Sequence, residues 1–235
     1  MLYLIGLGLS EKSFGLEARE AIDSSTKIYL ESYTVEFPYK KEDLEKQLKG
    51  KKIIPVDREF VEQKLDELIK EAKTNTVSLL VYGSPLTATT HITIIDEAKK
   101  NKVKVKVIHS SSIFDAIAET GLQVYKFGKT ASLPAFKADS YIDLVKDNQK
   151  IKAHTLILVD IGMTSKEAIE KLEKDSKDKK LKLEKIVICS QLGAPDSKIL
   201  YDTLKNLKDK KVKAPFCIII PSELHFVEKG FLEQF

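Results

Sequence analysis

Cysteine and histidine are scarce in this sequence, which argues against a fold stabilised by disulfides or by a bound metal ion. The 235 residues include two cysteines and four histidines. Cys189 and Cys217 lie in separate apolar runs with no C-x-x-C spacing, so buried thiols are favoured over a disulfide or a metal pair. The histidines are too scattered to form a zinc motif. We therefore expect neither a disulfide framework nor a metal site.

Arginine is also rare, with Arg19 and Arg58 the only two among 39 Lys and Arg residues. Against 35 Asp and Glu residues, the formal net charge of +4 comes almost wholly from lysine. Proteins that read nucleic acid favour bidentate arginine, so no direct nucleic-acid partner is expected.

Long apolar runs are absent as well. None approaches the roughly 18 residues that span a bilayer, and the N-terminal MLYLIGLGL predicts a first strand rather than a signal peptide. The composition, 43% hydrophobic and 31% charged, is that of an ordinary globular protein. We therefore expect a cytoplasmic protein with no membrane partner.

The first half of the chain alternates between short apolar runs and amphipathic stretches. Strands are predicted at residues 2–7, 27–30, 53–56, 77–82 and 103–108, and helices at residues 16–22, 65–72 and 91–100. This alternation is typical of a parallel sheet covered by helices.

The pattern changes after the HSSS run at residues 109–112. Helices are predicted at residues 113–122, 165–175 and 197–208, and strands at residues 155–160, 186–190, 216–221 and 225–227. Residues 125–136 predict a hairpin or an extended arm with a turn at Gly128, and the lysine-rich residues 174–185 predict a loop or a frayed helix end. The chain is thus predicted to form two α/β domains. Residues 1–110 carry an open parallel five-stranded sheet, and residues 111–235 carry a mixed sheet.

Four unusual loops follow predicted strands, where open parallel sheets bind ligands. They are GLGLS at residues 6–10, GSPLTATTH at 83–91, HSSSIF at 109–114 and DIGMTSKE at 160–167. The first is not the G-x-G-x-x-G fingerprint because Glu11 replaces the third glycine, and no P-loop occurs. A pyrophosphate ligand is disfavoured, whereas a nucleoside ligand without phosphates is not. Ser112 either caps the helix that begins at Ile113 or opens a helix whose N–H groups face a ligand.

Taken together, YLIGLGLSEK, YGSPLTATTH, VIHSSSIFDAIAETGLQVYKFGK, HTLILVDIG and IIIPSELHFVE resemble the diphthine synthases in order and spacing. These enzymes belong to the tetrapyrrole methylase-like class of S-adenosylmethionine methyltransferases. The resemblance covers essentially the whole chain, and GLQVYKFGK and PLTATTH are its most specific parts.

The resemblance implies S-adenosyl-L-methionine as the cofactor, released as S-adenosyl-L-homocysteine and bound without a metal. It implies a site in the cleft between the two domains, held largely by backbone groups. The candidate cofactor-binding residues are Leu9, Ser84, Thr87, Ser112, Ile113, Val159, Leu192 and Phe216. Taken alone, Ile113, Val159 and Leu192 look like ordinary core positions. Ser84 stands where the family usually has aspartate, and we expect its loop to be solvent-accessible without cofactor.

The implied reaction is repeated N-methylation of a 3-amino-3-carboxypropyl histidine in translation elongation factor 2, catalysed by a homodimer. A neutral amine can attack without a dedicated base, so no catalytic residue is assigned. His91 is the nearest candidate base, although a hydrogen bond within its loop is favoured. The alternatives are methylation of a tetrapyrrole carbon and a relative that binds the cofactor without catalysis.

Overall fold

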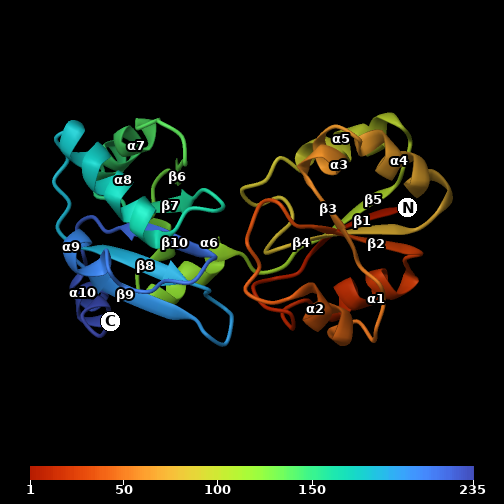
Figure 1. Ribbon diagram of the computed structural model, residues 1–235, viewed down its shortest axis with the longest axis horizontal. Coiled ribbons are helices and arrows are strands. Elements are labelled where there is room, and N and C mark those ends of the chain that lie inside the picture. The colour runs from red at the N-terminus through yellow and green to blue at the C-terminus, as the bar shows by residue number, and fades with distance from the viewer. The chain divides into compact units, whose positions relative to one another are not determined.

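The computed structural model describes residues 1–235, and the chain divides into two compact units (Figure 1). The first unit is Met1–Ile113 and the second is Phe114–Phe235. The boundary predicted from the sequence lies between residues 110 and 111.

The first unit is built on a parallel sheet with the strand order β3-β2-β4-β1-β5. Its strands are β1 (Leu2–Gly6), β2 (Lys27–Glu31), β3 (Ile54–Val56), β4 (Val77–Val81) and β5 (Val105–Ile108). The five strands and their parallel pairing confirm the sequence prediction. Every residue of β4 is buried, as expected for a central strand covered on both faces.

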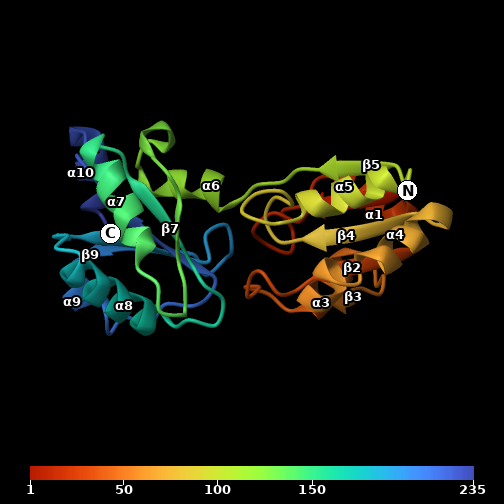
Figure 2. The same ribbon diagram turned by 90° about the horizontal axis from the view of Figure 1, so that it is seen from above.

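Helices cover both faces of this sheet (Figure 1). One face carries α1 (Leu16–Ser24) and α2 (Lys41–Gln47), and the other, shown in Figure 2, carries α3 (Arg58–Glu62), α4 (Leu65–Thr74) and α5 (Ile92–Lys100). Successive strand residues point to opposite faces, so Leu79 packs on the α4 side and Leu80 on the α1 side. The sequence did not predict α2 and α3, which are short and bury only Leu44 and Val61 respectively.

The second unit is built on a mixed sheet with the strand order β6-β7-β10-β8-β9. Its strands are β6 (Ala131–Leu133), β7 (Thr155–Val159), β8 (Ile186–Ser190), β9 (Lys198–Asp202) and β10 (Phe216–Ile220). β6 pairs in parallel with β7, and the other pairs are antiparallel. The predicted mixed sheet is confirmed.

Two long helices pack on the second sheet through an apolar cluster that includes Ile142, Leu172 and Ile218. They are α7 (Ser140–Lys150), which the sequence did not predict, and α8 (Ser165–Asp178). The shorter helices are α6 (Ile113–Ala116), η1 (Ile117–Thr120), η2 (Val124–Lys126), α9 (Leu204–Leu207) and α10 (Phe226–Leu232). Because α8 stops at Asp178, the lysine-rich segment 174–185 is a helix end followed by a loop, as predicted.

Residues 197–208 do not form the predicted helix. They contain β9 and the one-turn α9, which begins after Thr203, whose side chain accepts a hydrogen bond from the Asn206 N–H. Residues 198–202 pair along β8 at the edge of the sheet. Strand pairing of this kind overrides a short helix-like pattern and cannot be read from the local sequence.

Two further predictions in the second unit need correction. The helix predicted at residues 113–122 is broken, because α6 passes into η1 and the chain turns at Gly121, where φ is 77°. A side chain there would also overlap the ring of Phe231. The strand predicted at residues 225–227 is instead the start of α10, with His225 as its N-cap.

Residues 127–136 form the extended arm and not the alternative hairpin, because β6 pairs only with β7, and in parallel. Residues 125 and 126 belong to η2, and the turn predicted at Gly128 is not present. Gly128 serves a close approach, since a Cβ atom there would lie 2.2 Å from Asn148 Oδ1. The Asn148 side chain accepts from the Lys129 N–H (2.9 Å) and donates to the Lys129 carbonyl (2.8 Å) and to Thr155 Oγ1 (2.9 Å). The glycine therefore admits the amide that fixes the arm beside α7 and β7.

A buried carboxylate ties α10 to the segment around η2. Glu228 is fully buried and accepts hydrogen bonds from the N–H groups of Gln123 (3.0 Å) and His225 (2.8 Å) and from the Lys126 ammonium. A buried charge costs free energy unless it is paired in this way. The contacts therefore make Glu228 a structural anchor of the second unit.

His154 completes this network with its Nε2 atom 3.1 Å from Glu228 Oε1. The Ser222 N–H donates to Nδ1 of the same ring (2.9 Å), so Nε2 carries the ring proton. Burial lowers the pKa of His154, which keeps the ring neutral at pH 7. Burial alone would raise the pKa of Glu228, but hydrogen bonds, first from Lys126, outweigh burial and lower this pKa from 4.5 to about 2.

We predict that Glu228→Gln lowers the free energy of unfolding by about 3 kcal/mol at pH 7, because it breaks a buried ion pair. The folded-state pKa of Glu228 is depressed, so its stabilisation is present above pH 4.5 and is lost as the pH falls toward about 2. Urea unfolding at several pH values measures both effects.

The matched control is Glu223→Gln, which removes an exposed pair with Lys152 and should change stability by less than about 1 kcal/mol. Equal losses in the two variants, or a difference that does not shrink in acid, would contradict the assigned role of Glu228.

Candidate functional site

The carboxyl ends of β1 and β4 lie side by side in the first sheet, and the chain leaves them toward opposite faces. α1 follows β1 on one face, whereas α5 follows β4 on the other. Open parallel sheets bind ligands at such positions. β5 flanks β1 on its other side, so residues 109–112 reach the same edge.

Two glycines join the loops that follow β1 and β4. The Gly8 N–H donates to the Gly83 carbonyl (3.1 Å), and the Gly83 N–H donates to the Gly8 carbonyl (3.0 Å). Both residues have a φ of 71°, a conformation that favours glycine. The GLGLS and GSPL loops are therefore one hydrogen-bonded structure.

Position 6 has no room for a side chain, so only glycine fits there. A Cβ atom there would lie 2.6 Å from the Gly83 carbonyl oxygen, 2.9 Å from Pro85 Cδ and 3.0 Å from Ser110 Cβ. A Cβ atom on Gly8 would lie 3.0 Å from Ser110 Oγ and 3.2 Å from Ser111 Oγ. The loops after β1, β4 and β5 thus converge on Gly6 and Gly8, where there is no room for further side chains.

Aromatic side chains support the same edge. The Tyr82 hydroxyl donates to the Leu9 carbonyl (3.2 Å), and the Tyr82 ring meets Phe37 edge-on with centroids 5.2 Å apart. Phe37 in turn contacts Tyr39 at 5.4 Å. Burial raises the pKa of Tyr82, so its hydroxyl remains a donor at neutral pH. These contacts fix the loop that carries Leu9.

Five of the eight predicted site residues lie at this edge of the first unit, namely Leu9, Ser84, Thr87, Ser112 and Ile113. Leu9 and Ser112 are buried, and Thr87 and Ile113 are partly buried. The Thr87 N–H donates to the Ser84 carbonyl (3.1 Å), which closes a turn.

The expected accessibility of the loop is wrong for Ser84 itself, whose relative accessibility is only 8%, whereas Ala88 and Thr90 farther along the loop are exposed. It lies between Gly83 and Pro85, and these two residues approach Gly6 closely. The loop is packed against the ends of neighbouring strands, which a sequence pattern alone does not reveal.

The other three predicted residues, Val159, Leu192 and Phe216, lie at one edge of the second sheet. Cys217 pairs with Leu158, and Phe216 pairs with Ser190, so the start of β10 adjoins the ends of β7 and β8. Leu192 is buried, whereas Val159 and Phe216 are partly buried and pack against the core. The core role considered for Val159 is therefore present in the structure.

Gln191 fixes the loop that carries Leu192, a role that the sequence did not reveal. Its N–H donates to the Pro215 carbonyl (2.8 Å), and its side-chain amide donates to the Ala214 carbonyl (2.6 Å). Gln191 has a φ of 51°, which is uncommon for a residue with a side chain. Gly193, two residues later, is the feature of the sequence that could have predicted a turn here. In the adjoining strands, Cys189 and Cys217 are free and buried, as predicted.

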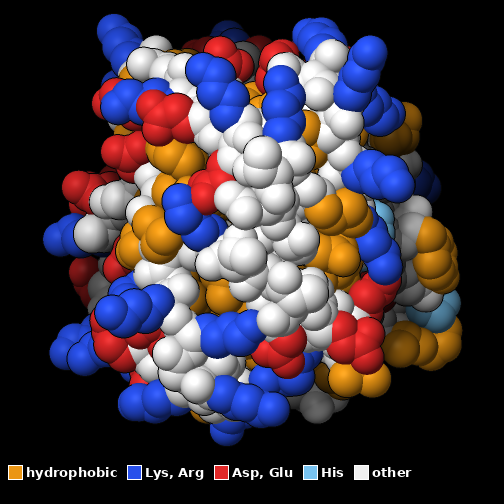
Figure 3. All heavy atoms as spheres, turned by 90° about the vertical axis from the view of Figure 1, so that its right-hand side faces the viewer, with side chains coloured by type: hydrophobic (Ala, Val, Ile, Leu, Met, Phe, Trp, Pro, Cys, Tyr) orange, Lys and Arg blue, Asp and Glu red, His pale blue; other side chains and the backbone are white.

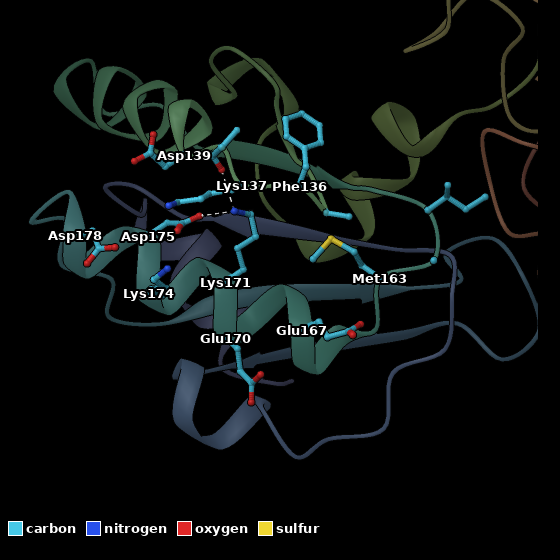
Figure 4. A pocket seen from close by; sticks show the side chains of 14 residues that line it. Phe136, Lys137, Asp139, Met163, Glu167, Glu170, Lys171, Lys174, Asp175 and Asp178 are labelled. Atoms are coloured by element: carbon cyan, nitrogen blue, oxygen red, sulfur yellow. Dashed lines mark hydrogen bonds and ion pairs between the residues drawn. The ribbon is translucent and has the colours of Figure 1, made fainter.

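The second unit also contains an open groove of about 880 Å³ (Figure 4). It lies among residues 135–139 after β6, residues 161–163 after β7, and the exposed side of α8. The Lys171 ammonium donates to the Ala138 carbonyl (2.9 Å) and pairs with Asp175 (2.9 Å). None of the eight predicted residues lines this groove, although the DIGMTSKE loop singled out in the sequence contributes Ile161, Gly162, Met163 and Glu167 to it.

Charges of both signs are mixed over the face shown in Figure 3, where Lys and Arg side chains are interspersed with Asp and Glu. No helix combines the length and the apolar character needed to cross a membrane. No group of three or more His, Cys, Asp or Glu side chains is arranged to hold a metal ion.

Comparison with known families agrees with this geometry. A sequence model described as Tetrapyrrole (Corrin/Porphyrin) Methylases matches residues 1–208. The matched region contains the converging loops of the first sheet and most strands of the second. The chain is therefore a methyltransferase of the tetrapyrrole methylase class.

Individual relatives define its place within that class. Diphthine methyl ester synthase from Dictyostelium discoideum is 39% identical over 100% of this chain and 98% of its own length. Diphthine synthase from Methanococcus aeolicus is 37% identical over 99% of this chain and 97% of its own length. A crystal structure of diphthine synthase matches with a TM-score of 0.92 and 32% identity, covering 100% of this chain and 96% of that chain. The chain belongs to the diphthine synthase family.

We predict that Gly6→Ala lowers the free energy of unfolding by about 1–3 kcal/mol, because the new methyl group must displace the Gly83 carbonyl or Pro85. Urea unfolding followed by circular dichroism measures this loss. Gly15→Ala is the control in the same unit, since a Cβ atom at Gly15 meets nothing within 4 Å. A Gly6→Ala variant as stable as this control would show that the three loops are not tightly packed.

Proposed function

We propose that this chain transfers methyl groups from S-adenosyl-L-methionine to the amino group of a 3-amino-3-carboxypropyl histidine in translation elongation factor 2, forming diphthine. The observation that carries the proposal is full-length similarity to relatives named for diphthine or its methyl ester. A cytoplasmic location and the lack of a direct nucleic-acid partner remain part of the proposal.

The chemistry of the first-unit loops fits the cofactor. Ser84, Thr87 and Ser112 offer hydroxyl groups, and Leu9 and Ile113 offer apolar side chains. Gly6, Gly8 and Gly83 let these loops pack closely together. S-adenosylmethionine carries no phosphate, and this chain has no phosphate-binding loop. These observations support Leu9, Ser84, Thr87, Ser112 and Ile113 as proposed cofactor contacts. Val159, Leu192 and Phe216 are proposed on the family resemblance alone.

When bound, the sulfonium supplies an activated methyl group. The chain must align the acceptor with it and exclude water, which are the main requirements of an in-line displacement. Buried Leu9, Ser84 and Ser112 provide positions from which water is already excluded. An α-amino group titrates at about 7.7–8.0, so modest desolvation makes it neutral and nucleophilic. No dedicated base is needed for transfer.

The test uses labelled S-adenosylmethionine and elongation factor 2 that carries the 3-amino-3-carboxypropyl histidine. We expect label to enter the factor, and mass spectrometry to place the added methyl groups on the amino group. Factor with an unmodified histidine is the control and should stay unlabelled.

Mild alkali separates the two products for which the relatives are named. N-methyl groups are stable in alkali, whereas a methyl ester is hydrolysed, so label that survives supports the proposed reaction. Cofactor binding without transfer would contradict it and favour a non-catalytic relative. Transfer only to a tetrapyrrole would favour the other alternative.

We also propose that the chain forms a homodimer through the surface of residues 125–136. Two aromatic side chains in this segment, Tyr125 and Phe136, are 83% and 69% exposed. Exposed aromatic residues are enriched at protein interfaces and suit a symmetric contact between two copies.

We predict that light scattering at micromolar concentration gives about twice the chain mass of 26.5 kDa. Tyr125→Asp should shift the mass toward the monomer, because an unpaired charge in an interface is costly. Lys150→Ala, which removes an exposed pair with Asp147 on α7, is the control and should remain dimeric. A monomeric wild-type protein would refute the proposed assembly.

A further inference from the structure

His91 closes the GSPLTATTH loop immediately before α5, and its side chain is almost entirely buried, with 1% relative accessibility. The sequence left two roles open for it, as a base or as a partner in a hydrogen bond within the loop. The atoms around the ring distinguish these roles.

The tautomer of His91 follows from its partner. Nδ1 lies 3.0 Å from the Pro85 carbonyl oxygen. A carbonyl oxygen only accepts hydrogen bonds, so Nδ1 must carry the ring proton. In the neutral ring Nε2 then presents a lone pair, and this atom is buried without a hydrogen-bond partner. Leaving a buried acceptor unpaired costs about 1–3 kcal/mol, so Nε2 does not stabilise the fold. The hydrogen bond from Nδ1 to Pro85 is therefore the contact that explains why the ring is buried here.

The Pro85 carbonyl is a point at which the loop can be held. Proline has no N–H, so backbone hydrogen bonding at this residue depends on its carbonyl. That oxygen accepts from His91 Nδ1 and also from Thr89 Oγ1 (2.8 Å). Both donors come from the far end of the same loop and draw it back onto Pro85.

Pro85 lies next to Ser84 and two residues before Thr87. Its ring also approaches Gly6, where an added Cβ atom would lie 2.9 Å from Pro85 Cδ. Movement of Pro85 would therefore shift Ser84 and disturb the turn in which the Thr87 N–H donates to the Ser84 carbonyl.

We propose that His91 is a positioning residue: its Nδ1–H holds the Pro85 carbonyl and thereby places Ser84 and Thr87 for cofactor binding. This inference rests on the proposed function, because it assumes that the loop binds S-adenosylmethionine. His91 itself does not exchange a proton with the substrate.

Two substitutions separate the ring nitrogens. The amide nitrogen of asparagine can occupy the position of Nδ1, whereas that of glutamine reaches farther, toward the position of Nε2. We expect His91→Asn to bind S-adenosylhomocysteine within about threefold of wild type, and His91→Gln to bind at least about tenfold more weakly, the size expected for a lost buried hydrogen bond. Calorimetry measures both, with circular dichroism to confirm folding.

A second pair of variants tests the carbonyl rather than the histidine. Thr89→Val removes the other donor to Pro85 and should weaken S-adenosylhomocysteine binding by about threefold to tenfold. Thr93→Val is the matched control, because Thr93 Oγ1 makes the same kind of bond to the Thr90 carbonyl (2.9 Å) without touching Pro85. Its affinity should not change.

Turnover at saturating cofactor decides between positioning and proton transfer. The His91→Asn variant should keep a kcat close to that of wild type. If asparagine and glutamine lower kcat equally while cofactor affinity is retained, Nε2 acts on the substrate and the proposal is wrong. Unchanged affinity in all His91 and Thr89 variants would also overturn it. Failure of the wild-type protein to bind S-adenosylhomocysteine would instead refute the proposed function.

Discussion

The candidate site depends on the close approach of two stretches of backbone, around Gly6 and Gly8 after β1 and around Gly83 after β4. The two loops exchange hydrogen bonds between Gly8 and Gly83, and Gly6 has no room for even one carbon atom. Larger residues would separate the loops and expose unpaired backbone groups at the end of a buried sheet, which is costly. The glycines thus create the surface, and the side chains of Tyr82, Thr89 and His91 hold it in shape.

Much of the fold could be predicted because its strands are buried on both faces and its longer helices are strongly amphipathic. All five strands of the first sheet were predicted, because short apolar runs such as residues 77–81 are typical of parallel strands that are buried on both faces. β9 was missed because its pairing with β8 is a tertiary contact. The turn at Gly121 likewise depends on a distant partner, Phe231. The start of α10 is set locally instead, by a capping box between His225 and Glu228.

The site was predictable to a different degree in the two units. In the first unit, parallel strands guarantee that loops after neighbouring strands meet, so a sequence that places unusual loops at strand ends already implies their association. In the second unit, antiparallel pairing places the start of β10 beside the ends of β7 and β8. No local sequence pattern predicts this pairing. The choice of Val159, Leu192 and Phe216 as site residues therefore came from family resemblance alone. Their grouping at one edge is a result of the fold.

The burial of Ser84 gives its departure from the family pattern a physical meaning. An aspartate at a position that is 8% exposed would need a positive partner or several donors to remain charged. A serine hydroxyl is neutral and needs far less, so the loop of this chain can pack tightly before any ligand arrives. The consequence for the proposed cofactor is that a serine at this position offers no charge-assisted hydrogen bond. The N–H and carbonyl groups of Gly8 and Gly83 are already paired with each other, so affinity for the proposed cofactor depends on how firmly these loops are held.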